Sequence, residues 1–226
     1  MLPDRMIGFR DQVVTIGVAT LLFGGGTLLP LLEASKRSAD RYHALYVLAF
    51  TSDMRQGEML GLPWKNVDLK DGVVRVLQTL VWGDGRWAFP RPKTERSRMT
   101  LWLRSEAVDT LREHRKRQLE ERMRNDGVWK DIGLVFPTTI GSPPARQNLA
   151  RRSFKPLLRE AGLPNIRFHD MRHTCATLLF TRGVHPKIVS EILGHSSVSI
   201  TLDVYSHVIP GLGDAAALAM EEALEE

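Results

Sequence analysis

The chain has 226 residues, of which 43% are hydrophobic and 25% charged, so it holds enough apolar material for a globular core. A single cysteine, Cys175, excludes an internal disulfide framework and fits a reducing compartment. The formal net charge is +5, but residues 214–226 contain five acids and no base, so the remainder carries +10. A basic body with an acidic end favours a polyanionic partner, although ordinary surface charge would give the same totals.

The N-terminal part contains an uncharged run over residues 13–32. Its length fits a transmembrane helix or a signal peptide. Four glycines and Pro30 interrupt the run, which favours packing on protein instead. We therefore interpret residues 1–32 as an atypical apolar leader outside the membrane, with insertion as the alternative.

Regular structure is expected from residue 33 onward. Apolar spacing and end signals predict helices over 40–52, 55–61, 104–124, 146–161, 169–182, 186–193, 197–206 and 213–225. β-branched and aromatic runs separated by Asp-Gly turns predict strands over 72–82, 86–90 and 97–103. The predicted fold class is mainly α with one small antiparallel β-sheet, an α+β arrangement.

The segment FHDMRHTCATLLF, residues 168–180, places four titratable side chains at the start of a predicted helix. Projected at 100° per residue, it has an apolar stripe on one face and His169, Arg172, His173 and Ala176 on the other. A helix N-terminus carries partial positive charge and free N–H groups. Histidine and arginine beside such an end predict an anion site, most specifically for phosphate.

A metal site is the alternative for this segment, because His169 and His173 have the i, i+4 spacing of helical zinc ligands. The residue after the first histidine is Asp170, however, and not the glutamate that such sites use as a base. Asp170 is expected to cap the helix instead. Arg172 lies between the histidines, and a cation beside a dication is costly. We therefore expect no metal and no other cofactor.

Five further polar residues stand against apolar backgrounds: Arg55 with Glu58 three positions later, Lys93 between two predicted strands, His195 after a helix-ending glycine, and Tyr205. Each has an ordinary structural explanation, as a surface ion pair, a solvated loop, a helix cap or a half-buried aromatic ring.

Taken in order, four sequence blocks resemble the tyrosine recombinases of the phage integrase family. The blocks are TSDMRQGEMLGLPWKNVDL, PKTERSRMTLWL, FHDMRHTCATLLF and EILGHSSVSITLDVYSHV, and the resemblance covers about residues 33–226. It implies the DNA breaking–rejoining catalytic fold over 33–226. The catalytic set that it implies is Arg55, Lys93, His169, Arg172, His195 and Tyr205.

The resemblance gives each residue a role at one scissile phosphate. Arg55 and Arg172 would hold the non-bridging oxygens with forked donors, and His195 would add a hydrogen bond. Tyr205 would be the nucleophile that forms a 3′-phosphotyrosine linkage.

Proton transfer falls to two further residues of the set. His169 would assist deprotonation of the nucleophile, and Lys93 would protonate the leaving 5′-oxygen. Glu58 and His173 are expected to support the set.

Two departures from the family pattern bear on activity. Asp53 stands where the family has a small residue before the first arginine, and a carboxylate there would compete with phosphate for the guanidinium. The family also has an N-terminal core-binding domain that closes around DNA, for which residues 1–32 are too short. A DNA-binding remnant without strand exchange is therefore the alternative to an active recombinase.

The expected partner is double-stranded DNA. Tetrameric self-association on that DNA is expected from the resemblance, through the acidic helix at 213–225. Packing of this amphipathic helix on its own domain is the alternative. The expected location is the cytoplasm, with the nucleoid when bound to DNA.

Overall fold

The computed structural model describes residues 28–52, 54–91, 99–181, 183–192 and 197–205. The chain divides into two compact units, one formed by residues 26–175 and the other containing the described residues from Ala176 onward. Helix α8 (Asp170–Thr181) crosses the boundary between them. The two units are therefore taken in turn.

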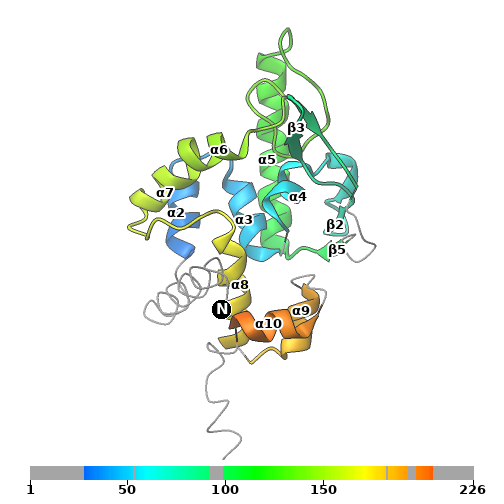
Figure 1. The fold of residues 1–226 in the computed structure, drawn as a ribbon. Coiled ribbons are helices and arrows are strands. Elements are labelled where there is room, and N and C mark those ends of the chain that lie inside the picture. The colour runs from blue at the N-terminus through cyan, green and yellow to red at the C-terminus, as the bar shows by residue number, and fades with distance from the viewer. Residues whose placement is uncertain (1–27, 53, 92–98, 182, 193–196, 206–226) are drawn as a thin grey trace, which may run out of the picture. The chain divides into compact units, whose positions relative to one another are not determined.

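The first unit contains most of the helices and all the strands that the structure describes (Figure 1). Its helices are α2 (Leu29–Arg37), α3 (His43–Thr51), α4 (Gln56–Leu60), α5 (Ser105–Arg124), α6 (Arg146–Leu149) and α7 (Lys155–Glu160), with a 3₁₀ turn at Trp64–Asn66 and a π-helical turn, η3 (Ala150–Phe154). Its strands are β1 (Val67–Asp68), β2 (Val73–Val76), β3 (Val81–Gly83), β4 (Arg86–Ala88) and β5 (Met99–Trp102). The mainly helical prediction is confirmed, and the bounds of α3, α4 and α5 agree with it within a few residues. Helix α2 and strand β1 have no predicted counterpart.

The expected small antiparallel sheet is confirmed, and a separate two-stranded hairpin accompanies it. Strands β1, β2 and β5 form an antiparallel sheet with β2 in the centre, and Val74 pairs with Val67 and Leu101. Strands β3 and β4 form a separate hairpin in which Trp82 pairs with Trp87. The predicted strand over 72–82 therefore breaks after Val76, and its second half pairs locally.

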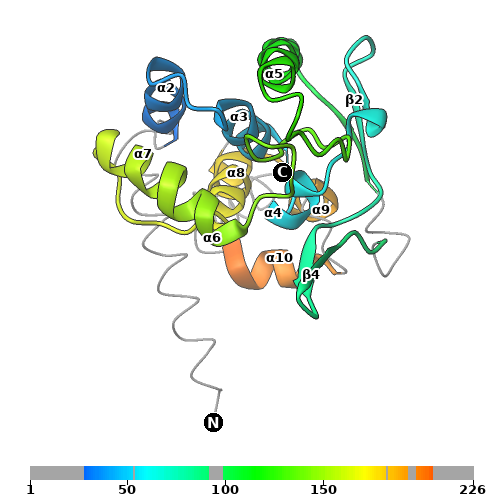
Figure 2. The same cartoon turned by 90° about the horizontal axis from the view of Figure 1, so that it is seen from above.

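Residues 146–160 form one helical stretch in which the π-helical turn separates α6 from α7. In Figure 2, α6 and α7 follow one another along this stretch. The turn contains Phe154, whose ring lies 5.9 Å from that of Tyr46 and 5.4 Å from that of Phe168. The Tyr46 hydroxyl lies 2.5 Å from Ser153 Oγ, which donates to an oxygen of Asp40 at 2.7 Å. This aromatic cluster, Tyr46, Phe154 and Phe168, joins α3, the π-helical turn and the residues before α8.

The first unit includes residues of the uncharged run. Helix α2 begins at Leu29, and Leu28 and Leu31 are buried in the core of the first unit. The end of the uncharged run thus covers a hydrophobic face of the protein, while residues 13–27 lie outside the described part. Among the described residues, no helix has the length and apolar character needed to span a membrane.

The second unit contains the end of α8 with α9 (Pro186–Ile192) and α10 (Val198–Tyr205), which pack on each other. Val189 and Thr201 are fully buried. The expected face assignment fails at Ala176, which was placed with the polar residues of α8 but has no exposed surface. The predicted helix over 213–225 lies outside the described residues.

His114 occupies an apolar site on the inner face of α5. Its Nε2 donates to the carbonyl oxygen of Val135 at 2.6 Å, and its ring lies 6.2 Å from Trp64 and 5.1 Å from Phe136. Burial disfavours the charged ring and lowers its pKa to about 4. The folded protein therefore holds this histidine neutral.

We expect His114 to make the protein less stable as the solution is acidified. Between about pH 6.5 and about pH 4 the unfolded chain binds a proton at this ring that the folded chain refuses, so the free energy of unfolding falls through that window. The loss is on the order of 3 kcal/mol at its lower end. Urea unfolding above and within the window, compared with His114→Gln, measures it. If the free energy of unfolding fell equally steeply with decreasing pH in the two proteins, His114 would not have the lowered pKa.

Candidate active site

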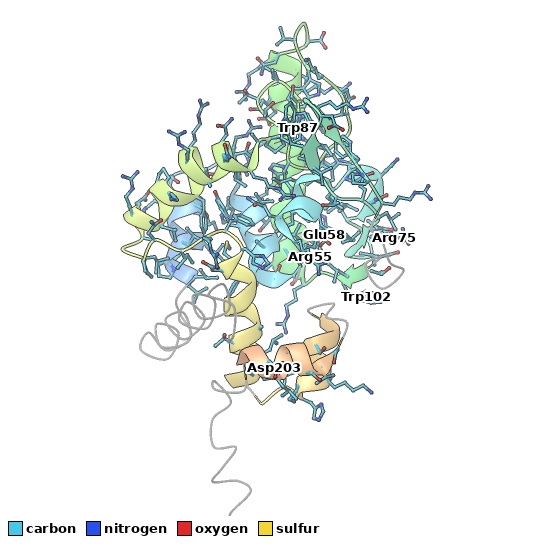
Figure 3. All side chains as sticks on the ribbon, viewed as in Figure 1. Arg55, Glu58, Arg75, Trp87, Trp102 and Asp203 are labelled. Atoms are coloured by element: carbon cyan, nitrogen blue, oxygen red, sulfur yellow. The ribbon has the colours of Figure 1, made fainter. Side chains whose placement is uncertain are left out.

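Arg55 and Glu58 form the first element of the site, at the start of α4. One Glu58 oxygen accepts the backbone N–H of Arg55 at 2.7 Å, and the other accepts Nη1 of its guanidinium at 3.1 Å. The Glu58 side chain is 5% exposed and that of Arg55 is 47% exposed. Figure 3 labels both residues, which lie next to each other. The predicted pair is thus confirmed, and it is more than a surface contact. The buried carboxylate binds the backbone N–H and one guanidinium nitrogen of Arg55, and most of the five guanidinium N–H donors stay available.

Helix α4 is held closely against the chain after β2. The Leu80 N–H donates to the Gly57 carbonyl at 2.7 Å, and Gln78 Nε2 donates to the Gly61 carbonyl at 2.7 Å. A Cβ on Gly57 would lie 2.6 Å from Thr79 Oγ1 and would also collide with the Arg146 guanidinium. Only glycine leaves room for this approach, which sets the position of α4 and therefore of Arg55.

His169 is presented by a turn whose neighbours are buried. Phe168 is 7% exposed and Met171 is 1% exposed, while His169 between them is exposed. Asp170, the first residue of α8, has a side chain only 5% exposed. The burial of three neighbours leaves the turn little freedom.

Asp170, the expected helix cap, lies in the first turn of α8, and its carboxylate binds Arg167. One of its oxygens accepts the Arg167 backbone N–H at 2.7 Å, and the other accepts Nη2 of the same arginine at 3.0 Å. The carboxylate still lies in the first turn of α8, where the helix dipole favours a negative charge. Its partner, however, is a residue that precedes the helix.

Arg167 is the residue that the sequence analysis missed. Its contacts with Asp170 repeat those of Arg55 with Glu58: the backbone N–H and the guanidinium of one residue bind the buried carboxylate three positions later. The signal was present as a basic residue three positions before an acid, in RQGE and in RFHD, each at the start of a helix. A charge at such a position is usually read as solvated, and its partner's burial was not visible in the sequence.

The starts of α4 and α8 meet at one small cavity within the first unit. Gln56, which follows Arg55, lies on one side of it, and His169 lies on another. Among the described residues, its lining is formed by Ala49, Met54, Gln56, Met59, Phe168, His169 and Met171. The structure therefore brings together two segments that are more than a hundred residues apart and that were both selected from the sequence.

For the remaining predicted residues, the structure gives the backbone position of some and does not describe the others. Arg172 and His173 are in the first turns of α8, and Tyr205 is the last residue of α10. Lys93 and His195, like Asp53, lie outside the described residues. Within the described ranges, no group of three or more histidine, cysteine or acidic side chains is arranged to hold a metal ion.

The arrangement suits an anion. Arg55 offers donors held in place by Glu58, and an exposed histidine lies directly before the first turn of α8, where the helix dipole is positive. Guanidinium donors fixed in this way match the geometry of a phosphate or carboxylate group.

Comparison with protein families and curated proteins agrees with this picture. A family model described as the phage integrase family matches residues 27–210. A protein named "Tyrosine recombinase XerC-like" from Caldanaerobacter subterraneus subsp. tengcongensis is 41% identical over 182 residues, covering 75% of this chain and 46% of that protein. The ICEBs1 integrase of Bacillus subtilis (strain 168) is 30% identical over 169 residues, covering 75% and 45%. The chain thus spans about half the length of these curated relatives.

Solved structures show the same fold. The Tn1549 transposon integrase, determined in complex with transposon right end DNA, superimposes with a TM-score of 0.67 at 22% identity, covering 86% of this chain and 63% of that one. The XerA recombinase gives a TM-score of 0.60 at 21% identity, with 88% and 61% covered. At these identities the likeness establishes the fold and not the chemistry of individual residues.

Proposed function

We propose that this chain, which belongs to the phage integrase family, provides the catalytic domain of a site-specific DNA recombinase for the integration and excision of a mobile element. The observation that carries the proposal is the meeting of the Arg55 and His169 segments at one cavity, with Arg55 held by a buried carboxylate. The Tn1549 integrase and the XerH recombinase, both similar in fold, have structures in complex with DNA, which supports DNA as the substrate.

The reaction exchanges one phosphodiester for another. The Tyr205 hydroxyl oxygen attacks the phosphorus, the bond from phosphorus to the 5′-oxygen breaks, and a 3′-phosphotyrosine ester remains on the protein. The tyrosine proton passes to a base, for which His169 is the candidate, and the leaving 5′-oxygen takes a proton from Lys93. The bond is conserved in the ester, so a 5′-hydroxyl of another strand can reverse the step without an energy source.

The charge that develops on the phosphate needs fixed donors. A pentavalent transition state gains negative charge on its non-bridging oxygens, which Arg55 and Arg172 are proposed to bind, with His195 adding a further hydrogen bond. Preorganised donors of this kind are worth roughly 3–4 kcal/mol each. Glu58 prevents the Arg55 guanidinium from reorienting as the charge develops, and His173 is proposed to support the same turn of α8.

The wider setting follows from the reaction. Strand exchange joins two duplexes, so we propose that the protein self-associates on DNA as a tetramer and that the segment 213–225 contributes to the contact. Such an enzyme would act in the cytoplasm, at the nucleoid. Native gels of the chain on a duplex carrying its recombination site measure this, and one protein per duplex at every concentration would contradict it.

A nicked suicide duplex tests the proposed chemistry directly. We expect a covalent protein–DNA adduct that resists SDS, forms in EDTA and is absent from Tyr205→Phe, because that variant retains the ring and lacks the attacking oxygen. Denaturing gel electrophoresis measures the adduct. DNA binding without any adduct would instead favour a DNA-binding remnant, and an adduct abolished by EDTA would favour metal-dependent chemistry.

The Glu58 carboxylate gives a second test of the same site. We expect Glu58→Gln to lower the rate of adduct formation by about 10-fold to 100-fold, because a neutral amide holds the guanidinium weakly and leaves it free to turn away from phosphate. The adduct rate at saturating DNA measures this effect. Glu160→Gln, which removes a carboxylate paired with Arg37 on the surface, is the matched control and should leave the rate unchanged. Equal rates for the two variants would remove Glu58 from the mechanism.

A further inference from the structure

A basic hollow lies along η3 and α7, in the first unit. Arg151, Lys155 and Arg159 follow one another at intervals of four residues and line the same side, a step of about 6 Å along a helix. No ion pair between described residues includes any of the three, and the neighbouring Glu160 is bound to Arg37 at 2.9 Å. The hollow also has Leu158, Leu163 and Asn165 in its lining.

The segment that leaves this hollow leads to the candidate active site. Between Asn165 and His169 the exposed and covered residues alternate: Asn165, Arg167 and His169 are exposed, while Ile166 and Phe168 pack on the core. The exposed side chains therefore share one side of the segment. A row of donors runs from the hollow, past Arg167, to His169.

Arg167 is the fixed member of the row. The buried Asp170 carboxylate binds its Nε and Nη2, and 58% of the arginine side chain remains exposed. The Nη1 donors are directed away from that carboxylate, as a planar fork requires. Glu58 holds Arg55 in a related way, through the backbone N–H and Nη1.

From this row we infer a phosphate track, defined as Arg151, Lys155, Arg159, Asn165 and Arg167, that binds consecutive backbone phosphates beside the scissile one. The cationic members donate hydrogen bonds and accept none, so the partner must present regularly spaced anionic acceptors. A nucleic-acid strand does so, and the helical step is close to the spacing of its neighbouring phosphates. The location of the track beside the scissile phosphate rests on the proposed function. The binding of DNA phosphates by the track rests on its charge and spacing alone.

Salt dependence of DNA binding tests the track. In the 226-residue chain, the triple variant Arg151→Gln, Lys155→Gln, Arg159→Gln should lower the slope of log affinity against log salt by about 2 to 3, because each phosphate contact contributes about 0.9. The weakening should be the same for unrelated duplex sequences. The control Lys70→Gln, Lys116→Gln, Lys130→Gln removes the same charge from lysines elsewhere in the first unit and should change the slope by less than about 1. Equal changes in the two triples would overturn the track.

Two further variants separate a phosphate contact from a folding effect. Arg151→Lys with Arg159→Lys retains both charges and should retain the slope, so a lower slope there would overturn the track. Arg167→Lys retains the charge but cannot be held by Asp170 through two nitrogens. Arg167→Lys should weaken DNA binding by several-fold. The thermal unfolding midpoint of the Gln triple should stay near that of the parent protein. Unchanged binding by Arg167→Lys would exclude Arg167 from the track.

Phosphate ethylation interference locates the track on the DNA and separates this inference from the proposed chemistry. The phosphates whose ethylation weakens binding of the parent but not of the Gln triple should lie next to the cleavage position. At saturating DNA the triple should still form the Tyr205 adduct. If the parent protein formed no adduct, the proposed chemistry would be wrong. The slopes of log affinity against log salt would then still test whether the track binds DNA. If those phosphates lay far from the cleavage position, the location of the track would be overturned.

Discussion

Burial of the aromatic cluster is the constraint on which the site depends. Phe168 packs with Tyr46 and Phe154, and so fixes the chain one residue before His169. Truncating a buried phenylalanine typically costs about 3–5 kcal/mol, so the cluster has ample energy to hold a turn in one conformation. Because Phe168 and Met171 both point into the core, His169 between them has to face outward. The same cluster joins α3 to the π-helical turn, and thereby places η3 and α7 beside the segment that leads to α8.

Buried carboxylates then orient exposed arginines. Glu58 and Asp170 are almost fully covered, and each spends both oxygens on the arginine three residues earlier. Leaving either carboxylate buried without its partner would be costly, so each pair persists although its arginine is in contact with solvent. Each carboxylate binds the backbone N–H and one side of the guanidinium of its arginine. The rest of the guanidinium can therefore contact a ligand at the surface although the side chain is held in one orientation. Each pair lies at the start of a helix, where the helix dipole adds to the same positive region.

The protein is a member of the phage integrase family that covers about half the length of its curated relatives. Its first unit contains the segments of Arg55 and of His169, and its second contains the helix that ends at Tyr205. Arg55 and Arg172, the two arginines proposed to bind the phosphate, therefore belong to the first unit, and the proposed nucleophile belongs to the second. The position of Arg55 depends on packing within residues 26–175.

The sequence by itself determined the order and type of the elements, because apolar spacing and turn residues act locally and survive in any helical or extended segment. It also indicated the candidate catalytic residues, since four sequence blocks in one order identify a family, which no single arginine or histidine does. It misjudged the strand over 72–82, where a run suited to one strand instead divides between two sheets, because strand pairing is decided by partners distant in the chain. Ala176 failed for a related reason: helical projection gives relative directions, while burial depends on what surrounds the helix on every side. Only the tertiary structure decided that Glu58 and Asp170 are buried, that Arg167 repeats Arg55, and that Gln56 and His169 line one cavity, because each of these depends on packing between segments far apart in the chain.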